Sequence, residues 1–433
     1  MKELFRTVND IPKVCYPSLH PRVALKALCY NRKFGNILYN FMKLRILFAR
    51  VAPLVLAMLA LLALISCGGD SSSSTTNPVS GFDPRIYVLN SYYGTAIIMN
   101  GKNDQVYQST IGVGGGANLI AESLDQKLTL VGSPINNTIT SIDNATESVT
   151  QTIGIPGTSD SFSIVSDNNS GVVAVRNAPV TNQSSGAVVL LDIANGKISG
   201  SVPVPLVRFL SLNKARTKVL AFAENSNSVY VIDTTAQTAT PVPGFDRPVA
   251  AVFATDDTHA YILNCGPECG GTTASVTLFD TSNNTLGVNI PVSAATVGLI
   301  DSNKLYVAGT ANNLGQLDVI DTGSNTRTQT GIAISNGYHW KMALASGNNL
   351  YIGAQNCTNQ GTGCLSIFPT SSNTAIQSTT IGSVNGIQPI SGRNSVYVSI
   401  GGELVIFDTS TNKPQTNQFD VIGFAGDVKQ INP

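Results

Sequence analysis

Charged side chains are scarce in this 433-residue sequence. They make up 12% of it, where about a quarter is usual. Histidine and tryptophan are rarer still, with three copies and one copy. A histidine-rich copper centre needs several imidazoles, so His259 and His339 alone cannot build one. No G-x-S-x-G sequence occurs, which excludes the nucleophile elbow of many hydrolases.

The even overall balance of charge hides a difference along the chain. Residues 1–66 hold 10 of the 26 basic and 2 of the 26 acidic residues, which leaves 16 basic against 24 acidic residues in 67–433. A domain with this net charge of −8 repels phosphate backbones, so we expect no nucleic-acid partner. Ser, Thr, Asn and Gly take the place of charges between short Val/Ile/Tyr runs. This composition is typical of an all-β extracytoplasmic protein.

An apolar run that ends in a cysteine lies near the N-terminus. Residues 51–65 are apolar except for a proline, and a basic segment precedes them. Their length suits a signal segment and is short for a membrane span. The sequence Leu64-Ile65-Ser66-Cys67 resembles the lipobox of bacterial lipoproteins, which implies lipidation of Cys67 and cleavage before it. An uncleaved transmembrane anchor is the alternative.

This resemblance divides the chain into four parts. A second methionine, Met42, stands directly before the basic segment, so we expect residues 1–41 to be a misassigned upstream extension. Residues 42–66 then form the signal peptide, 67–84 the lipidated cysteine with a Ser/Thr-rich tether, and 85–433 the folded domain. Gly68 follows the cysteine where aspartate would signal inner-membrane retention, which favours the outer membrane. The predicted location is the bacterial cell envelope, with a lipid anchor in the membrane.

A repeat of 41 to 47 residues runs through the domain. Eight related apolar strands recur, each followed by a second strand; the first strands are RIYVLN (85–90), KLTLVG (127–132), GVVAVR (171–176), KVLAFA (218–223), HAYILN (259–264), KLYVAG (304–309), NLYIGA (349–354) and SVYVSI (395–400). This period is the one expected for propeller blades of four strands. In six units the second strand ends in an aspartate that can start a turn: Asp143, Asp192, Asp233, Asp280, Asp321 and Asp408.

The repeat resembles the YVTN family of propeller repeats. Its clearest copies are YVLN (87–90) and SVYVIDTT (228–235). The resemblance and the period predict an all-β fold, a single propeller of eight four-stranded blades. Seven blades, as in many family members, are the alternative, and they would need about 50 residues each, which is long for this repeat type. The first unit lacks an innermost strand, so we expect residues 424–433 to supply it and close the ring.

Four cysteines remain after the leader and Cys67. Cys265 and Cys269 share one loop, Cys357 and Cys364 share another, and each loop links the second and third strands of a unit. We predict one disulfide within each loop, as in proteins of oxidising compartments. A zinc site is the alternative, but CxxxC and CxxxxxxC spacings without a nearby histidine do not favour it.

The sequence predicts neither a cofactor nor a metal. Propellers that bind quinone cofactors carry a tryptophan in most blades, and this chain has one tryptophan. The glycine-rich GVGGGAN (112–118) leads into a predicted strand, whereas a phosphate cradle leads into a helix.

The candidate site lies where the innermost strands begin. The loops that lead into these strands share one face with the cysteine loops, here called the loop face. Arginine there can bind carboxylate or phosphate, and tryptophan offers a flat wall. The candidate ligand-binding residues are Asp160, Arg208, Asp246, Arg247, Tyr338, His339 and Trp340. The alternative is structural: Arg208 and Asp160 as an ion pair, Trp340 as core and His339 as a loop cap.

These observations predict a non-catalytic binding or scaffold module that acts through its loop face. Its partner would be a protein, a glycan or a small ligand. An enzyme at the channel mouth (a lactonase-like hydrolase, a lyase or an oxidoreductase) is the alternative. It would need His339 or Asp160 to show a shifted pKa beside the two arginines.

Overall fold

A computed structural model describes residues 80–358, 363–378, 380–415 and 419–431. The predicted upstream extension, signal peptide and lipidation site, and all of the tether before Ser80, lie outside these ranges. Among the described residues, no helix has the length and hydropathy of a membrane span.

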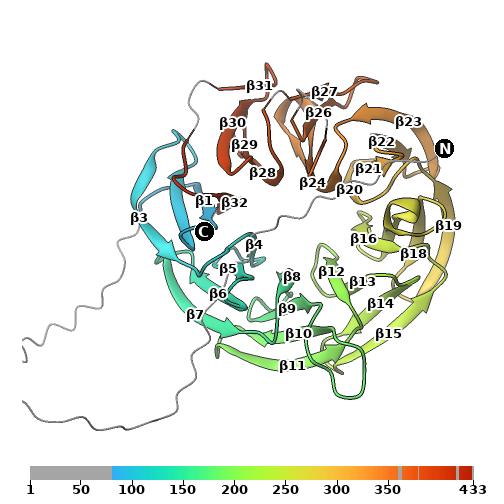
Figure 1. The fold of residues 1–433 in the computed structure, drawn as a ribbon, viewed down its shortest axis with the longest axis horizontal. Coiled ribbons are helices and arrows are strands. Elements are labelled where there is room, and N and C mark those ends of the chain that lie inside the picture. The colour runs from blue at the N-terminus through green and yellow to red at the C-terminus, as the bar shows by residue number, and fades with distance from the viewer. Residues whose placement is uncertain (1–79, 359–362, 379, 416–418, 432–433) are drawn as a thin grey trace, which may run out of the picture. The chain divides into compact units, whose positions relative to one another are not determined.

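Residues 85–431 form eight four-stranded antiparallel sheets around a ring, which confirms the eight-bladed propeller (Figure 1). Blade 1 contains β32 (Ala425–Ile431), β1 (Arg85–Asn90), β2 (Thr95–Asn100) and β3 (Val106–Gly112), from the channel outward. Blade 2 contains β4 (Leu119–Glu122), β5 (Leu128–Ser133), β6 (Thr138–Asp143) and β7 (Ser148–Gly154). Blade 3 contains β8 (Ser159–Ile164), β9 (Ser170–Val175), β10 (Ala187–Asp192) and β11 (Lys197–Pro203). Blade 4 contains β12 (Val207–Leu212), β13 (Val219–Ala223), β14 (Ser228–Asp233) and β15 (Thr238–Pro243).

The second half of the ring follows the same order. Blade 5 contains β16 (Pro248–Phe253), β17 (His259–Asn264), β18 (Ser275–Asp280) and β19 (Thr285–Pro291), with the short 3-10 helix η1 (Gly266–Cys269). Blade 6 contains β20 (Val297–Asp301), β21 (Lys304–Ala311), β22 (Leu314–Asp321) and β23 (Thr326–Ile334). Blade 7 contains β24 (Tyr338–Ala345), β25 (Asn349–Gln355), β26 (Leu365–Pro369) and β27 (Ile376–Gln377), with η2 (Ser346–Asn348). Blade 8 contains β28 (Val384–Pro389), β29 (Ser395–Ile400), β30 (Glu403–Asp408) and β31 (Lys413–Pro414).

The core lies between neighbouring blades, because the middle strands are covered on both faces. Every residue of β1 and β29 is buried, whereas β19 buries only one of its seven residues. Apolar clusters accordingly join consecutive blades; one, for example, runs from Leu220 and Phe222 of blade 4 to Ile262 and Phe279 of blade 5. This is why the repeat reads as near-continuous apolar runs rather than strict alternation.

The repeated aspartates form turns, as the sequence predicts. Asp233 Oδ1, for example, accepts hydrogen bonds from the backbone N–H groups of Thr235 (2.9 Å) and Ala236 (2.7 Å). In blade 7, where Pro369 replaces the aspartate, the outermost strand β27 pairs at only two positions.

The C-terminal strand closes the ring. β32 pairs antiparallel with β1, from Ile431 opposite Arg85 to Ala425 opposite Asn90. The outer edge of the same junction holds an ion pair, in which Arg393 Nη2 of blade 8 donates to Asp104 Oδ2 of blade 1 at 3.0 Å. The ring therefore has no open sheet between its first and last blades.

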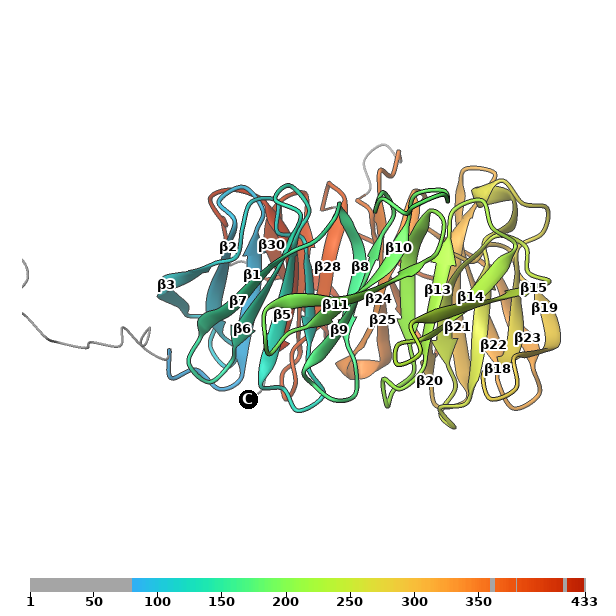
Figure 2. The same cartoon turned by 90° about the horizontal axis from the view of Figure 1, so that it is seen from below.

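The chain enters the ring on the face opposite the loop face. The backbone N–H of Ser80 donates to the Glu147 carboxylate (2.6 Å) in the turn between β6 and β7. Arg85, at the start of β1, pairs with the same carboxylate at 2.9 Å, and both side chains are buried. In side view the strands cross the thickness of the ring, so the loops gather on two opposite faces (Figure 2).

Each cysteine loop contains its own disulfide, as predicted: Cys265 pairs with Cys269 and Cys357 with Cys364. Both pairs lie between the second and third strands of their blades. Disulfides persist in oxidising compartments, so this pair of bonds indicates an extracytoplasmic protein.

Candidate functional site: the channel mouth

Three of the seven predicted residues meet in one cavity on the loop face. Arg208, Arg247 and Tyr338 line a space of about 280 Å³, which we call the mouth pocket. Two acids that the sequence analysis did not select, Glu224 and Glu268, lie with them. The apolar part of its wall is formed by Phe209, Phe222 and Val249.

An ion-pair network holds one side of the mouth pocket. Glu224 Oε1 accepts hydrogen bonds from Arg208 Nη1 (3.1 Å) and Arg176 Nη1 (2.8 Å). Arg176 Nε in turn lies 3.7 Å from Asp160 Oδ2. The predicted ion pair between Arg208 and Asp160 is therefore relayed through Arg176 and Glu224. Arg208 also lies over the Phe209 ring, with its guanidinium carbon 5.0 Å from the ring centroid.

Tyr338, at the start of β24 in blade 7, lies beside Arg208 of blade 4. Its ring centroid lies 5.9 Å from the guanidinium carbon of Arg208. Burial raises the pKa of the Tyr338 phenol to about 12, so it stays protonated at neutral pH. The phenol therefore adds a neutral hydrogen-bonding group to a wall of charged ones.

The first disulfide loop supplies Glu268. The helix η1 between Cys265 and Cys269 carries this carboxylate toward blade 6, where Oε2 accepts a hydrogen bond from the Thr310 backbone N–H (2.8 Å). Burial disfavours the charged carboxylate and raises the pKa of Glu268 to about 7. The mouth pocket thus contains a carboxyl group that titrates near neutral pH.

Arg247 has no hydrogen-bonding partner for its side chain among the described residues, although it lines the pocket. Its neighbour Asp246 lies close enough to feel its charge: against the effect of burial, hydrogen bonds from Thr272 and Thr273 and the charge of Arg247 lower the pKa of the Asp246 carboxyl. One Asp246 oxygen accepts hydrogen bonds from the Thr272 backbone N–H (2.8 Å), the Thr272 hydroxyl (2.5 Å) and the Thr273 backbone N–H (2.7 Å). We therefore assign Asp246 to the support of this loop rather than to the pocket wall.

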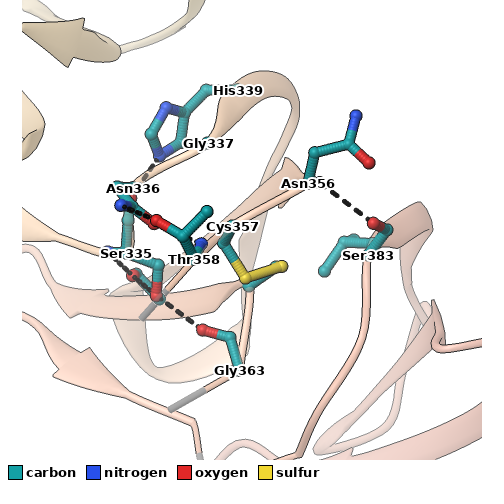
Figure 3. The surroundings of a disulfide bond; sticks show 12 residues. Ser335, Asn336, Gly337, His339, Asn356, Cys357, Thr358, Gly363 and Ser383 are labelled. Carbon is teal, nitrogen blue, oxygen red and sulfur yellow. Dashed lines mark hydrogen bonds between the residues drawn. A yellow bond between two sulfur atoms is a disulfide. The ribbon is translucent and has the colours of Figure 1, made fainter. Parts of the chain in front are cut away.

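His339 lies outside the pocket, inside the loop structure of blade 7. Its side chain is 1% exposed, and Nε2 lies 2.8 Å from the Ser335 carbonyl oxygen. Figure 3 shows the ring against the segment from Ser335 to Gly337, near the Cys357 disulfide. Burial lowers the pKa of His339 to about 4, so the ring is neutral near pH 7. This placement matches the structural alternative, in which His339 caps a loop.

Trp340 and Asp160 line a second cavity inside the channel, of about 320 Å³. This cavity shares Phe209, Val249 and Tyr338 with the mouth pocket, so the two adjoin. Trp340 Nε1 donates to the Val384 carbonyl oxygen at 2.7 Å. The Lys341 ammonium lies 4.7 Å from the Trp340 ring centroid and pairs with Asp427 at 3.2 Å.

The pKa of Asp160 is raised by its surroundings. Burial raises its pKa, and the nearby cations Arg176 and Arg208 offset only part of that effect. Among the described residues, no three His, Cys, Asp or Glu side chains are grouped so that they could hold a metal ion.

The sequence offered little indication that Glu224 and Glu268 belong to the pocket. Glu268 lies inside the quoted cysteine loop NCGPECGG, but nothing in that sequence indicates that the loop crosses to blade 6. Glu224 follows the second strand of its unit, at a loop position with no motif of its own.

Comparison with known proteins supports the fold. No family model matches the chain, and no curated protein matches its sequence. Among solved structures, it is similar to dihydro-heme d1 dehydrogenase NirN in complex with DHE (TM-score 0.64, 12% identity, 80% of this chain and 75% of that chain). It is also similar to a functionally unknown protein from Desulfotomaculum acetoxidans (TM-score 0.52, 13% identity, 81% and 99%). BamB from Moraxella catarrhalis is a third (TM-score 0.51, 10% identity, 75% and 91%). At these identities the similarity concerns the propeller fold alone.

Proposed function

We propose that this protein is a non-catalytic binding module of the bacterial cell envelope whose mouth pocket takes a small organic anion. The observation that carries the proposal is Arg247, which lines the pocket and donates no side-chain hydrogen bond to any described residue. A guanidinium binds carboxylate or phosphate through two parallel N–H groups. Arg208 is already held by Glu224, so Arg247 is the cation left for a ligand.

The rest of the pocket suits a ligand with an apolar body. Phe209, Phe222 and Val249 form an apolar surface beside the two guanidinium groups. Binding pockets of this kind combine apolar walls with a few placed polar groups. The volume of about 280 Å³ lies at the lower end of the range for small-molecule sites. A compact carboxylate or phosphate ester therefore fits better than an extended chain.

An enzyme receives less support from the site. Acid–base catalysis needs titrating groups within hydrogen-bond reach of the substrate. His339 is enclosed in its loop, and Asp160 lies in the adjoining cavity beside Arg176. Glu268 remains as a titrating group in the mouth pocket, and one carboxyl without a nucleophile does not assemble a hydrolase.

The family and the anchor are further parts of the proposal. We place the chain with the YVTN-type propeller repeats on its YVLN and SVYVIDTT sequences, and we propose a lipid anchor at Cys67 on its lipobox. The two disulfides support an extracytoplasmic location. Mass spectrometry of the N-terminal peptide tests the anchor: we expect an acylated Cys67, and a Cys67→Ser variant should leave the membrane fraction. An unmodified peptide that continues upstream of Cys67 would contradict it.

Calorimetric titration tests the pocket, with benzoate, succinate and phenyl phosphate as probes. We expect saturable binding of at least one probe, weakened at least tenfold by Arg247→Ala, because a charge-assisted bidentate contact is lost. Lys413→Ala is the control, since that exposed cation lies on the outermost strand β31 of blade 8. No binding of any probe, or equal binding by wild type and Arg247→Ala, would contradict the proposal.

A further inference from the structure

The most exposed large apolar side chains of the described residues all lie on the loop face. Six exceed 60% exposure: Tyr92 (75%), Tyr93 (61%), Ile135 (77%), Leu314 (62%), Ile381 (78%) and Ile422 (71%). Each lies at or within a loop that links a second to a third strand or leads into an innermost strand. On the opposite face, Leu124 in the β4–β5 turn is 43% exposed, and no large apolar side chain among the described residues there exceeds 60%.

Five of these six belong to three neighbouring blades, 8, 1 and 2. Tyr92 and Tyr93 are in the β1–β2 loop of blade 1, and Ile135 is in the β5–β6 loop of blade 2. Ile381 leads into blade 8, and Ile422 leads into the closing strand of blade 1. With Phe424, which is 44% exposed, these five form what we call the apolar patch.

Backbone contacts make the patch continuous from blade 8 to blade 1. A Cβ on Gly401 would lie 2.7 Å from the Ile381 carbonyl oxygen, and one on Gly402 would lie 2.9 Å from the Phe424 ring. The Phe424 carbonyl in turn accepts a hydrogen bond from the Ser91 N–H at 2.8 Å. The loops of Ile381, Phe424 and Tyr92 therefore adjoin.

Glycines continue the patch into blade 2. The Gly116 N–H donates to the Ser91 carbonyl oxygen at 2.9 Å, and a Cβ on Gly116 would lie 2.7 Å from Ile135 Cγ1. Gly116 has a φ of +75° and ends the three glycines at 114–116 of GVGGGAN, which have no side chains of their own. These glycines, which have no role in the mouth pocket, lie next to Ile135 and to the polar side chain of Asn136.

The patch has the size of one side of a protein interface. Aromatic side chains bury roughly 150–250 Å² each; with the three smaller isoleucines included, the exposed parts of the patch amount to on the order of 700 Å². A standard interface buries about 800 Å² on each partner, and the largest apolar patch of a typical monomer is about 300–600 Å². Tyrosine and phenylalanine are also enriched at interface centres.

The charges around the patch favour a protein over a membrane as its occupant. Its loops (91–94, 113–118, 134–137, 381–383, 401–402 and 420–424) contain Asp420 and no lysine or arginine, and the exposed Glu403 adjoins them, where its carboxylate accepts a hydrogen bond from the Val421 N–H at 3.4 Å. Attraction to anionic lipids needs basic residues. The chain also enters the ring on the opposite face, at Ser80. The six side chains of the patch are themselves uncharged, and a two-fold axis places the same side chains of two copies opposite one another.

We propose that the apolar patch is the face through which two copies of this chain associate about a two-fold axis. In the ring, blade 1 stands across from blade 5 and blade 8 across from blade 4, and blades 4 and 5 with Tyr338 of blade 7 line the mouth pocket (Figure 1). The patch and the mouth pocket share no residue. The proposal is independent of what the mouth pocket binds.

Sedimentation velocity of the full chain in nonionic detergent, over a range of concentrations, tests the dimer. We expect a dimer of wild-type chains and a monomer of the Tyr92→Ser/Ile422→Ser variant at the same concentration. Leu314→Ser is the matched control, because Leu314 is an equally exposed apolar residue of the loop face outside the patch. Circular dichroism of each variant checks that it is folded.

Two results would overturn the proposal. One is a wild-type chain that stays monomeric at every concentration, and the other is a double variant that dimerises as well as wild type. Flotation with phosphatidylethanolamine/phosphatidylglycerol vesicles tests the alternative that the patch binds a membrane. Vesicle binding by a monomeric Cys67→Ser chain, lost in the double variant, would assign the patch to lipid instead.

Discussion

The two halves of the loop face differ in chemistry although they are built from the same repeat. Blades 3 to 5 contribute Arg176, Arg208, Glu224, Arg247 and Glu268 around the mouth pocket. Blades 8, 1 and 2 contribute tyrosine, isoleucine and phenylalanine on a glycine-rich backbone. The second strands of both halves bury all or all but one of their residues, so the difference lies in the loops. The propeller fold sets the position of each loop, and the sequence of the loop sets which side chains it exposes.

The halves also differ in how their side chains are held. In the charged half Arg176 and Arg208 pair with Glu224, whereas the side chain of Arg247 has no hydrogen-bonding partner among the described residues. The apolar patch leaves its largest side chains in solvent. The first arrangement suits a small ligand that enters a prepared site, and the second suits a surface that another protein covers.

Removal of a disulfide should have the largest effect, and it should distinguish the loop of the charged half (Cys265–Cys269) from the loop of blade 7 (Cys357–Cys364). Cys265→Ser/Cys269→Ser and Cys357→Ser/Cys364→Ser should each lower the free energy of unfolding by about 2–2.5 kcal/mol, from the entropy of a short closed loop. Only the first pair frames Glu268, so only its loss should also weaken probe binding at the mouth pocket several-fold. Urea denaturation and calorimetric titration measure both quantities. Equal losses of binding in the two variants would break the comparison.

Glu268→Gln tests the buried carboxyl of the charged half. The pKa of Glu268 is about 7 in the folded protein, above its ordinary value of 4.5. Between these values the folded state binds more protons than the unfolded state, so stability falls as pH rises through this window. Glutamine keeps an acceptor for the Thr310 N–H and has no charge to desolvate. The variant should therefore gain about 1–2 kcal/mol on wild type at pH 8, after discounting for partial exposure, and nothing at pH 4.

Urea denaturation of both proteins from pH 4 to pH 8 measures this difference. An identical pH dependence for wild type and Glu268→Gln would show that the carboxyl is solvated. The mouth pocket would then contain no buried acid at this position.

Tyr92→Ser/Ile422→Ser should have the smallest effect on the stability of the single chain. Both side chains are more than 70% exposed, and exposed substitutions usually change the free energy of unfolding by less than about 0.5 kcal/mol. Denaturation at low protein concentration, where the chain is monomeric, measures this value. A loss above about 1.5 kcal/mol would mean that the patch belongs to the core of the ring and would end its contrast with the mouth pocket.

The architecture was predictable because propeller strands must be apolar on both faces. The period of the first strands located all eight blades, and the unpaired C-terminal segment predicted the closing strand that the structure places at Ala425–Ile431. Close spacing within single loops predicted both disulfides. These features are local or follow from the repeat, so they can be predicted from the sequence alone.

The candidate site was less predictable. Loop position selected Arg208, Arg247 and Tyr338, which do line one pocket, but it also selected His339 and Asp246, whose polar atoms are taken up inside their own loops. A position at the mouth of the channel does not say whether a side chain turns toward the pocket or into its loop. That direction depends on neighbours such as Ser335 and Thr272, which no repeat pattern identifies.

The sequence by itself determined the number of blades, the closure of the ring and the pairing of the cysteines, because each depends on spacing along the chain. Only the tertiary structure decided which side chains share a surface. Glu268 of blade 5 reaches the backbone of blade 6, and Tyr92 and Ile422 adjoin across 330 residues. The physical reason is that ring closure brings distant loops together on one face, and burial and hydrogen bonding there choose which side chains stay available.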